Sequence, residues 1–130
     1  MQQGVRSMPI LPANDLAASV TFFTSKLGFE LAGSWKDDDG TPNFAIVQMG
    51  HITVGLASSD RPGTGDDWAA YFYIEDIAAF TDQILGRGVK ILRGPDDSFY
   101  QCREVEIADP HGNRMCFAQD LKPGADGPGL

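Results

Sequence analysis

A small set of reactive side chains carries the chemistry that this sequence offers. Cys116 lies two residues after Arg114 on a predicted strand, and a cationic neighbour can lower the pKa of a thiol and make it nucleophilic. His51, in a tight turn with Gly50, could act as a general base. A buried thiol is more often inert, however, and a turn histidine is often only solvated. The residues alone leave both interpretations open.

Aromatic residues accompany these groups and suggest a binding surface. Tyr71 and Tyr73 alternate along one predicted strand, whereas Trp35, Trp68 and Tyr100 lie near strand ends or in loops. Aromatic walls with a few polar groups suit a planar or bulky organic ligand. The alternative is that the tyrosines only fill a core.

Length and composition restrict the classes of protein to consider. The chain has 130 residues and a net charge of −8, so it lacks the basic face of a nucleic-acid binder. No apolar run reaches the roughly 18 residues of a membrane helix, and no apolar signal core is present. Two cysteines are too few for a disulfide scaffold. We expect one cytoplasmic domain, 1–130, that contacts neither nucleic acid nor membrane.

Hydrophobic periodicity predicts one order of elements that occurs twice: a strand, a helix and three strands. Asp15 and Asp76 are placed to cap the two helices. The predicted strands are 8–13, 29–36, 44–49, 52–57, 68–74, 89–92, 102–108 and 114–119. They form a first module over 8–57 and a second over 68–119, followed by a tail at 120–130 that we expect to be flexible.

Internal similarity supports the two modules. Asp15-Leu-Ala-Ala matches Asp76-Ile-Ala-Ala, and Val54-Gly-Leu matches Met115-Cys-Phe, both at an offset of 61 residues. A single match of this kind could be chance, but a shared offset across the chain indicates tandem repeats.

Three segments give the chain a family resemblance. They are the strand-to-helix junction 13–23, the Leu-Gly-Phe-Glu-Leu segment 27–31, and the Arg-Glu…Asp-Pro-His-Gly-Asn segment 103–113. With them the chain resembles the vicinal-oxygen-chelate superfamily, which groups glyoxalase I, extradiol dioxygenases, fosfomycin-resistance enzymes and bleomycin-resistance proteins. The resemblance covers about residues 8 to 119. It implies an α+β fold of two βαβββ modules in tandem, with sheets curled around a central cavity, and a homodimer.

The resemblance also specifies where metal ligands would lie. Enzymes of the family hold a divalent metal with His and Glu side chains, and the corresponding positions here are Met8, Gly55, Ala69 and Cys116. This set supplies neither a carboxylate nor an imidazole. We therefore expect no metal and no other cofactor.

If those four positions face the cavity, strand alternation predicts the rest of its lining. On the strands 44–49 and 102–108, it places Ala45, Val47, Glu104 and Glu106 toward the cavity and Phe44, Ile46, Val105 and Ile107 toward the helices. An ion pair between Arg103 and Glu104 is a further, purely structural interpretation. The candidate ligand-binding residues are Trp35, His51, Trp68, Tyr71, Tyr73, Tyr100, Glu104, Arg114 and Cys116.

The main hypothesis is a metal-free small-molecule binding protein of the antibiotic-sequestration type, without turnover. The acidic chain is compatible with a cationic ligand. One alternative is a metal-dependent lyase or dioxygenase with displaced ligands, for which His51, Glu104 and Glu106 are the candidates. Others are a metal-free enzyme that uses Cys116 or His51, and an interaction module whose cavity is filled by tyrosines.

Overall fold

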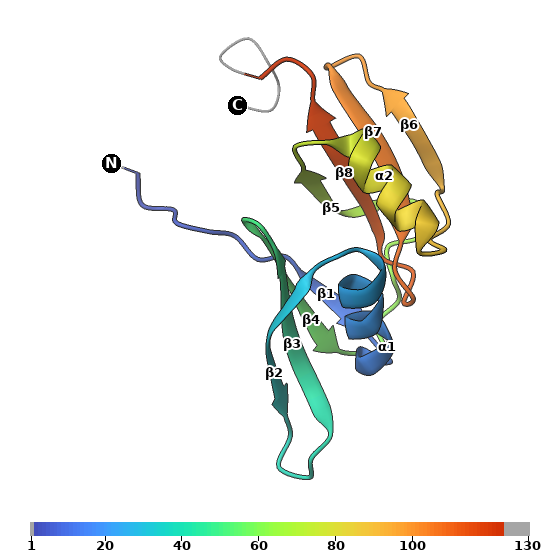
Figure 1. Ribbon diagram of the computed structural model, residues 1–130. Helices are drawn as coiled ribbons and strands as arrows, with labels where there is room; N and C mark the ends of the chain where they lie inside the picture. Colours follow the sequence, from blue (N-terminus) through green and yellow to red (C-terminus); the bar gives the residue numbers. More distant parts are fainter. Residues whose placement is uncertain (1, 124–130) are drawn as a thin grey trace. The chain divides into compact units, whose positions relative to one another are not determined.

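The computed structural model describes residues 2–123, which form two compact units (Figure 1). The first unit runs to Gly63 and includes the turn Asp109–Asn113, and the second contains Thr64–Ala108 and the chain from Arg114 onward. Of the tail predicted at 120–130, residues 124–130 lie outside the described residues. No helix within residues 2–123 is both long and apolar enough to cross a membrane.

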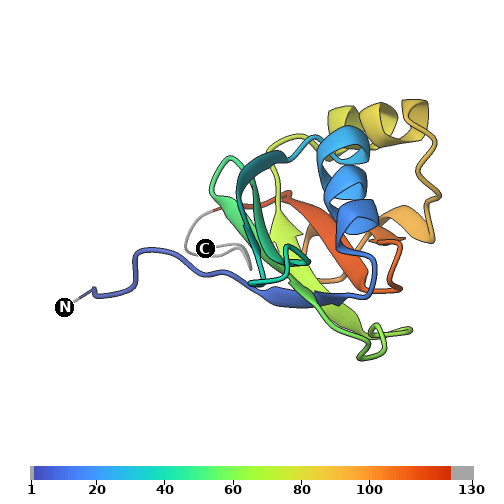
Figure 2. The ribbon, with the colours of Figure 1, turned by 90° about the horizontal axis from the view of Figure 1, so that it is seen from below.

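The first unit is a four-stranded sheet with a helix packed against β3 and β4. The strand order is β1-β4-β3-β2, in which β1 runs parallel to β4 and the other neighbours are antiparallel. Its elements are β1 (Ile10–Ala13), α1 (Leu16–Thr21), the π-helical turn η1 (Phe22–Lys26), β2 (Glu30–Lys36), β3 (Pro42–Met49) and β4 (Ile52–Ser58). The chain before β1 is extended (Figure 2).

The second unit repeats this connectivity. Its strand order is β5-β8-β7-β6, again with the first strand parallel to the last. Its elements are β5 (Trp68–Tyr73), α2 (Ile77–Gly86), β6 (Arg93–Asp97), β7 (Cys102–Ala108) and β8 (Arg114–Asp120). The prediction of an α+β fold with two βαβββ modules is confirmed.

Both helices begin at the caps that the sequence predicts. The carboxylates of Asp15 and Asp76 each accept a hydrogen bond from the backbone N–H three residues later, at 3.0 Å. Gly28 and Gly88 follow the helices with φ angles of 86° and 84°, a left-handed conformation that favours glycine. Each helix thereby turns the chain back toward its own sheet.

Each unit buries one face of its sheet beneath its helix. In the first unit this core contains Phe23, Leu27, Leu11, Ala45, Val47, Val54 and Leu56. In the second it contains Ile77, Phe80, Ile84, Phe72, Val105, Ile107, Met115 and Phe117. Burial of this apolar surface leaves the opposite face of each sheet for other side chains.

The predicted orientation of β3 is wrong. Ala45 pairs with Leu56 and is buried on the helix side, and Val47 is buried there as well. Phe44 and Ile46 therefore lie on the other face, where Ile46 pairs with Gly55. A Cβ atom at Gly55 would come within 2.9 Å of the Phe44 ring. The large residues thus cover a glycine, whereas the smaller side chains fit beneath α1.

The predicted strand 89–92 is also misplaced, because β6 begins at Arg93. Val89 is buried, and its N–H donates to the carbonyl of Ile84 at the end of α2, so it belongs to the helix ending. The segment around Pro95, predicted as a loop, is an edge strand with a register shift between Arg93 and Asp96. An edge strand tolerates proline because one side of it needs no backbone donor.

Candidate functional site

The face of the second sheet opposite α2 carries most of the candidate residues. One row crosses all four strands, since Tyr71 pairs with Cys116, Cys116 with Glu106, and Glu106 with Arg93. Directly paired residues share a face of a sheet. We call this surface the ionic face, and it comprises Trp68, Tyr71, Tyr73, Arg93, Tyr100, Glu104, Glu106, Arg114 and Cys116.

Two carboxylates form the centre of the ionic face. Glu104 and Glu106 are only 2% and 5% exposed. The guanidinium of Arg93 contacts both, donating to Glu104 Oε1 at 2.7 Å and through Nε to Glu106. Arg114 Nε donates to Glu106 Oε1 at 2.6 Å. Two arginines thus balance two carboxylates, as buried charges require.

Tyrosine hydroxyls complete the coordination of Glu104. Tyr71 donates to Glu104 Oε2 at 2.7 Å, and Tyr100 donates to the same oxygen. Ring centroids of Trp68 and Tyr71 lie 5.1 Å apart, and those of Tyr71 and Tyr73 lie 5.2 Å apart. These contacts form a row of aromatic rings along β5, beside the carboxylates.

Hydrogen bonding determines the protonation of this network. Burial alone raises the pKa of Glu104, but hydrogen bonds from Tyr100, Arg93 and Tyr71 outweigh it and hold the pKa below the usual value. Burial opposes the ionisation of Glu106 likewise, and Arg114 and Arg93 lower its pKa in the same way. Burial, and the contacts with Cys102 and Glu104, raise the pKa of Tyr71. At neutral pH the carboxylates are therefore charged and the tyrosine is neutral.

Cys116 lacks the environment of a nucleophile. The side chain is fully buried, and burial, reinforced by the charges of Glu104 and Glu106, raises the pKa of its thiol to about 12. Arg114, which the sequence offered as an activating neighbour, directs its Nε to Glu106. The thiol is consequently protonated at neutral pH.

Two further features of the ionic face differ from the sequence interpretation. Arg103 pairs with Asp97, at 2.7 Å, rather than with Glu104. Adjacent residues of a strand point to opposite faces, which rules out the proposed pair. Arg93 was missed because the predicted strand, 89–92, ended one residue before it, whereas β6 begins at Arg93. A strand starting at Arg93 would have set it opposite Glu106 on the antiparallel neighbour.

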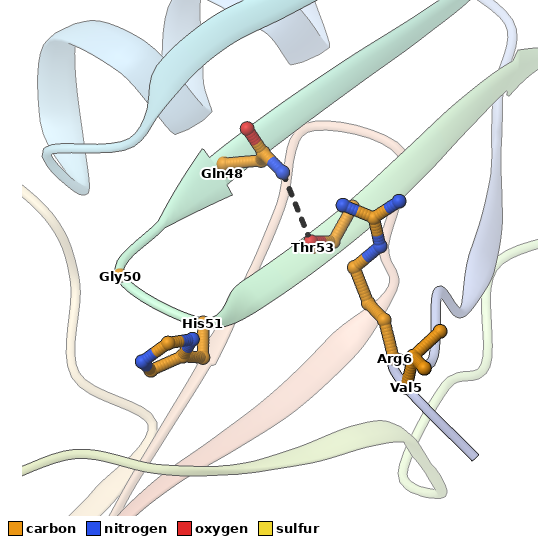
Figure 3. Close-up of a pocket in the computed structure, with 6 residues that line it drawn as sticks. All are labelled: Val5, Arg6, Gln48, Gly50, His51 and Thr53. Carbon is orange, nitrogen blue, oxygen red and sulfur yellow. Dashed lines mark hydrogen bonds between the residues drawn. The ribbon is translucent and has the colours of Figure 1, made fainter. Parts of the chain in front are cut away.

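The remaining candidates, Trp35 and His51, belong to the first unit. The Trp35 ring lies 5.8 Å from that of Phe44 and is half exposed. His51 lines a pocket of about 400 Å³ at the turn between β3 and β4 (Figure 3). We call it the arm pocket, and its lining residues are Val5, Arg6, Gln48, Gly50, His51 and Thr53.

The four positions that the family resemblance assigns to metal ligands do not fit a divalent cation. Gly55 has no side chain, and a Cβ atom there would come within 2.5 Å of Ile10 Cδ1. Met8 and Ala69 offer no oxygen or imidazole ligand, and the Cys116 thiol is buried and protonated. Within residues 2–123, no group of three or more His, Cys, Asp or Glu side chains is placed to hold a metal ion.

Comparison with known proteins identifies the family. A model described as the Glyoxalase/Bleomycin resistance protein/Dioxygenase superfamily matches residues 7–117, and the chain belongs to this superfamily. No curated protein matches the sequence.

Solved structures share the fold at low sequence identity. TioX from Micromonospora sp. ML1 is 18% identical, with a TM-score of 0.75 over 91% of this chain and 100% of that one. A superfamily protein from Alicyclobacillus acidocaldarius is 17% identical, with a TM-score of 0.76 over 94% and 96% of the two chains. TnmS3, an antibiotic binding protein from Streptomyces sp. CB03234, is 20% identical, with a TM-score of 0.73 over 92% and 98%.

Proposed function

We propose that this protein binds a planar, cationic or hydrogen-bond-donating organic molecule on the ionic face, without a metal and without turnover. One observation carries the proposal: Tyr71 and Tyr100 both donate their hydroxyl protons to Glu104. With its proton engaged, each hydroxyl can accept a hydrogen bond from a ligand but cannot donate one; the Tyr71 hydroxyl also contacts Cys102, and that of Tyr100 contacts Tyr71 and Ser98. The tyrosines consequently act as acceptors, and their rings add a surface for stacking.

The charges of the site favour the same ligand class. Glu104 and Glu106 are neutralised by Arg93 and Arg114, so they act as the scaffold that orients the tyrosines. A cation would instead be attracted by the ring faces of Trp68 and Tyr71, and at longer range by the net charge of −8. An organic anion would find neither tyrosine hydroxyl free to donate, because Glu104 accepts both protons.

The comparisons support an antibiotic-like ligand. TnmS3 shares the fold and is an antibiotic binding protein, although only 20% of its residues are identical. A planar ligand that carries an amine would match the stacking surface and the acceptors of the ionic face. We include in the proposal the homodimer and the cytoplasmic location that the family resemblance and composition led us to expect.

The experiment is a fluorescence titration of the Trp35→Phe variant, in which Trp68 is the one remaining tryptophan. The probes are a planar aromatic amine, doxorubicin, and a planar aromatic sulfonate, anilinonaphthalene sulfonate. We expect saturable quenching with the amine at micromolar concentration, weakened about tenfold by Tyr71→Ala, because a ring face in contact with a cation contributes up to about 2 kcal/mol.

A control variant, Leu85→Ala, removes an apolar side chain that is 51% exposed on α2, away from the ionic face. This substitution should leave the affinity for the amine unchanged. Equal binding of amine and sulfonate, or equal effects of Tyr71→Ala and Leu85→Ala, would contradict the proposal.

A further inference from the structure

We propose that the arm pocket of the first unit binds a small organic carboxylate, with Arg6 as the charged partner. This site lies in the first unit, whereas the ionic face lies in the second, and it goes beyond the proposed function because it takes a ligand of the opposite charge. The pocket is lined by an arginine, a histidine, a threonine and a glutamine, and by no aspartate or glutamate. The nearest carboxylate that strand pairing places on this face is that of Glu30, which pairs with Gln48 across β2 and β3.

The position of Arg6 follows from strand pairing. Ile10 pairs in parallel with Gly55, and the Gly55 N–H donates to the Pro9 carbonyl at 2.9 Å. The chain that precedes β1 leaves the sheet near the start of β4, and Arg6 lines the same pocket as Thr53 and His51. Figure 3 shows the Arg6 guanidinium extending toward Thr53. The guanidinium is thus available to a ligand in the pocket.

Thr53 supplies a donor beside the guanidinium. Its hydroxyl oxygen accepts a hydrogen bond from Gln48 Nε2 at 3.3 Å, so its own proton is directed elsewhere. The residue is only 5% exposed, which fixes the hydroxyl at the base of the pocket. A guanidinium and a hydroxyl are the donors that a carboxylate accepts from, and charge assistance strengthens both bonds.

The size of the pocket indicates an organic ligand. Its volume of about 400 Å³ lies at the lower end of small-molecule sites and exceeds what an inorganic ion fills. The Val5 side chain borders it and offers an apolar contact. A carboxylate on a small ring therefore matches both the donors and the space.

The experiment uses benzoate as the probe, with benzamide as its neutral counterpart and inorganic phosphate as a second anion. Binding is followed by amide chemical shifts of the full chain. We expect benzoate to saturate in the millimolar range or tighter, with shifts at residues 50–54 and near Arg6, and benzamide to bind about tenfold more weakly or worse. Phosphate binding as tight as that of benzoate would overturn the assignment to a carboxylate.

Two variants test the role of Arg6. Arg6→Gln should weaken benzoate binding about tenfold, because it removes the charge-assisted pair while leaving an exposed segment intact. The matched control, Arg61→Gln, removes another exposed arginine of the same unit, outside the pocket, and should change the affinity less than twofold. Equal effects of the two substitutions, or shifts confined to the ionic face, would overturn the proposal. The doxorubicin titration, which reports on the other site, is independent of either result.

Discussion

Replacing Arg93 by methionine tests the ionic face most sharply, because one guanidinium contacts both buried carboxylates. Glu104 would keep Tyr71 and Tyr100 as donors, and Glu106 would keep Arg114. Both carboxylates would remain almost fully buried with less compensation. We therefore expect Arg93→Met to destabilise the fold rather than to act as a neutral surface change.

The size of the loss follows from the burial of the partners. Removing one member of a buried ion pair costs about 3–5 kcal/mol in general. The Arg93 side chain is 35% exposed, so water screens part of its interaction, and the remaining donors compensate for some of the rest. We expect a decrease of about 2–3 kcal/mol in the free energy of unfolding at pH 7.

Arg103→Met is the matched control in the same sheet. The Arg103–Asp97 pair has side chains that are 44% and 54% exposed, and such pairs contribute less than about 1 kcal/mol. Urea unfolding of both variants at pH 7 gives the comparison. Adding Glu104→Gln to Arg93→Met should recover about 1 kcal/mol, because it removes a buried negative charge whose cationic partner is gone.

The pH dependence provides a second readout. Partners in the folded state lower the pKa values of Glu104 and Glu106, whose ordinary value is 4.5. The stabilisation is thus fully present above that pH and is lost as the pH falls through the lower folded-state pKa values. The difference between wild type and Arg93→Met should shrink as the pH falls from 6 to 3. A difference that is constant with pH, or a loss no larger than that of Arg103→Met, would refute the reasoning.

Three further predictions concern stability and reactivity. Tyr71→Phe should lower the free energy of unfolding by about 1–2 kcal/mol, measured by urea unfolding, because it removes a hydrogen bond to a charged group. An unchanged free energy of unfolding would mean that the bond does not form. Gly94→Ala should lower the free energy of unfolding by about 3 kcal/mol or more, since φ is +98° and a Cβ would collide with the Glu104 carbonyl. Gly86→Ala is the control, because open space surrounds that position, and it should be neutral or stabilising by up to about 1 kcal/mol. Equal melting temperatures of the two variants would contradict this prediction. Cys116 should react with iodoacetamide at pH 8 far more slowly in the native protein than in urea, because about one thiol in ten thousand is ionised at a pKa of about 12. Peptide mass spectrometry follows the labelling. Rapid labelling of the native protein would indicate an activated thiol.

The sequence predicted the elements that depend on local signals. The helix caps Asp15 and Asp76 are encoded within a few residues, and the structure places them as expected. On β7, hydrophobic Val105 and Ile107 alternate with charged residues, so their burial on the helix side could be predicted.

The errors arise where the outcome depends on a partner strand. Phe44, Ala45, Ile46 and Val47 are all apolar, so alternation alone does not tell which pair faces the helix. The glycine opposite Ile46 decides it, because the empty space on that face is filled by Phe44. Arg93 was missed for the same kind of reason, since its role is visible only once β6 is paired with β7. Pairing across a sheet is not a local property of the sequence.

The central claim is that the ionic face binds its ligand without a metal. Thermal unfolding of chelator-treated protein with added divalent metals tests it. The metals are Ni²⁺, Co²⁺, Mn²⁺, Fe²⁺ and Zn²⁺, each compared with the planar amine doxorubicin. A metal bound to the native state would add about 2.7 kcal/mol of stability at a hundredfold excess over its Kd. We predict that doxorubicin raises the unfolding temperature in a saturable manner and that no metal does. A saturable rise with any one metal would contradict the account.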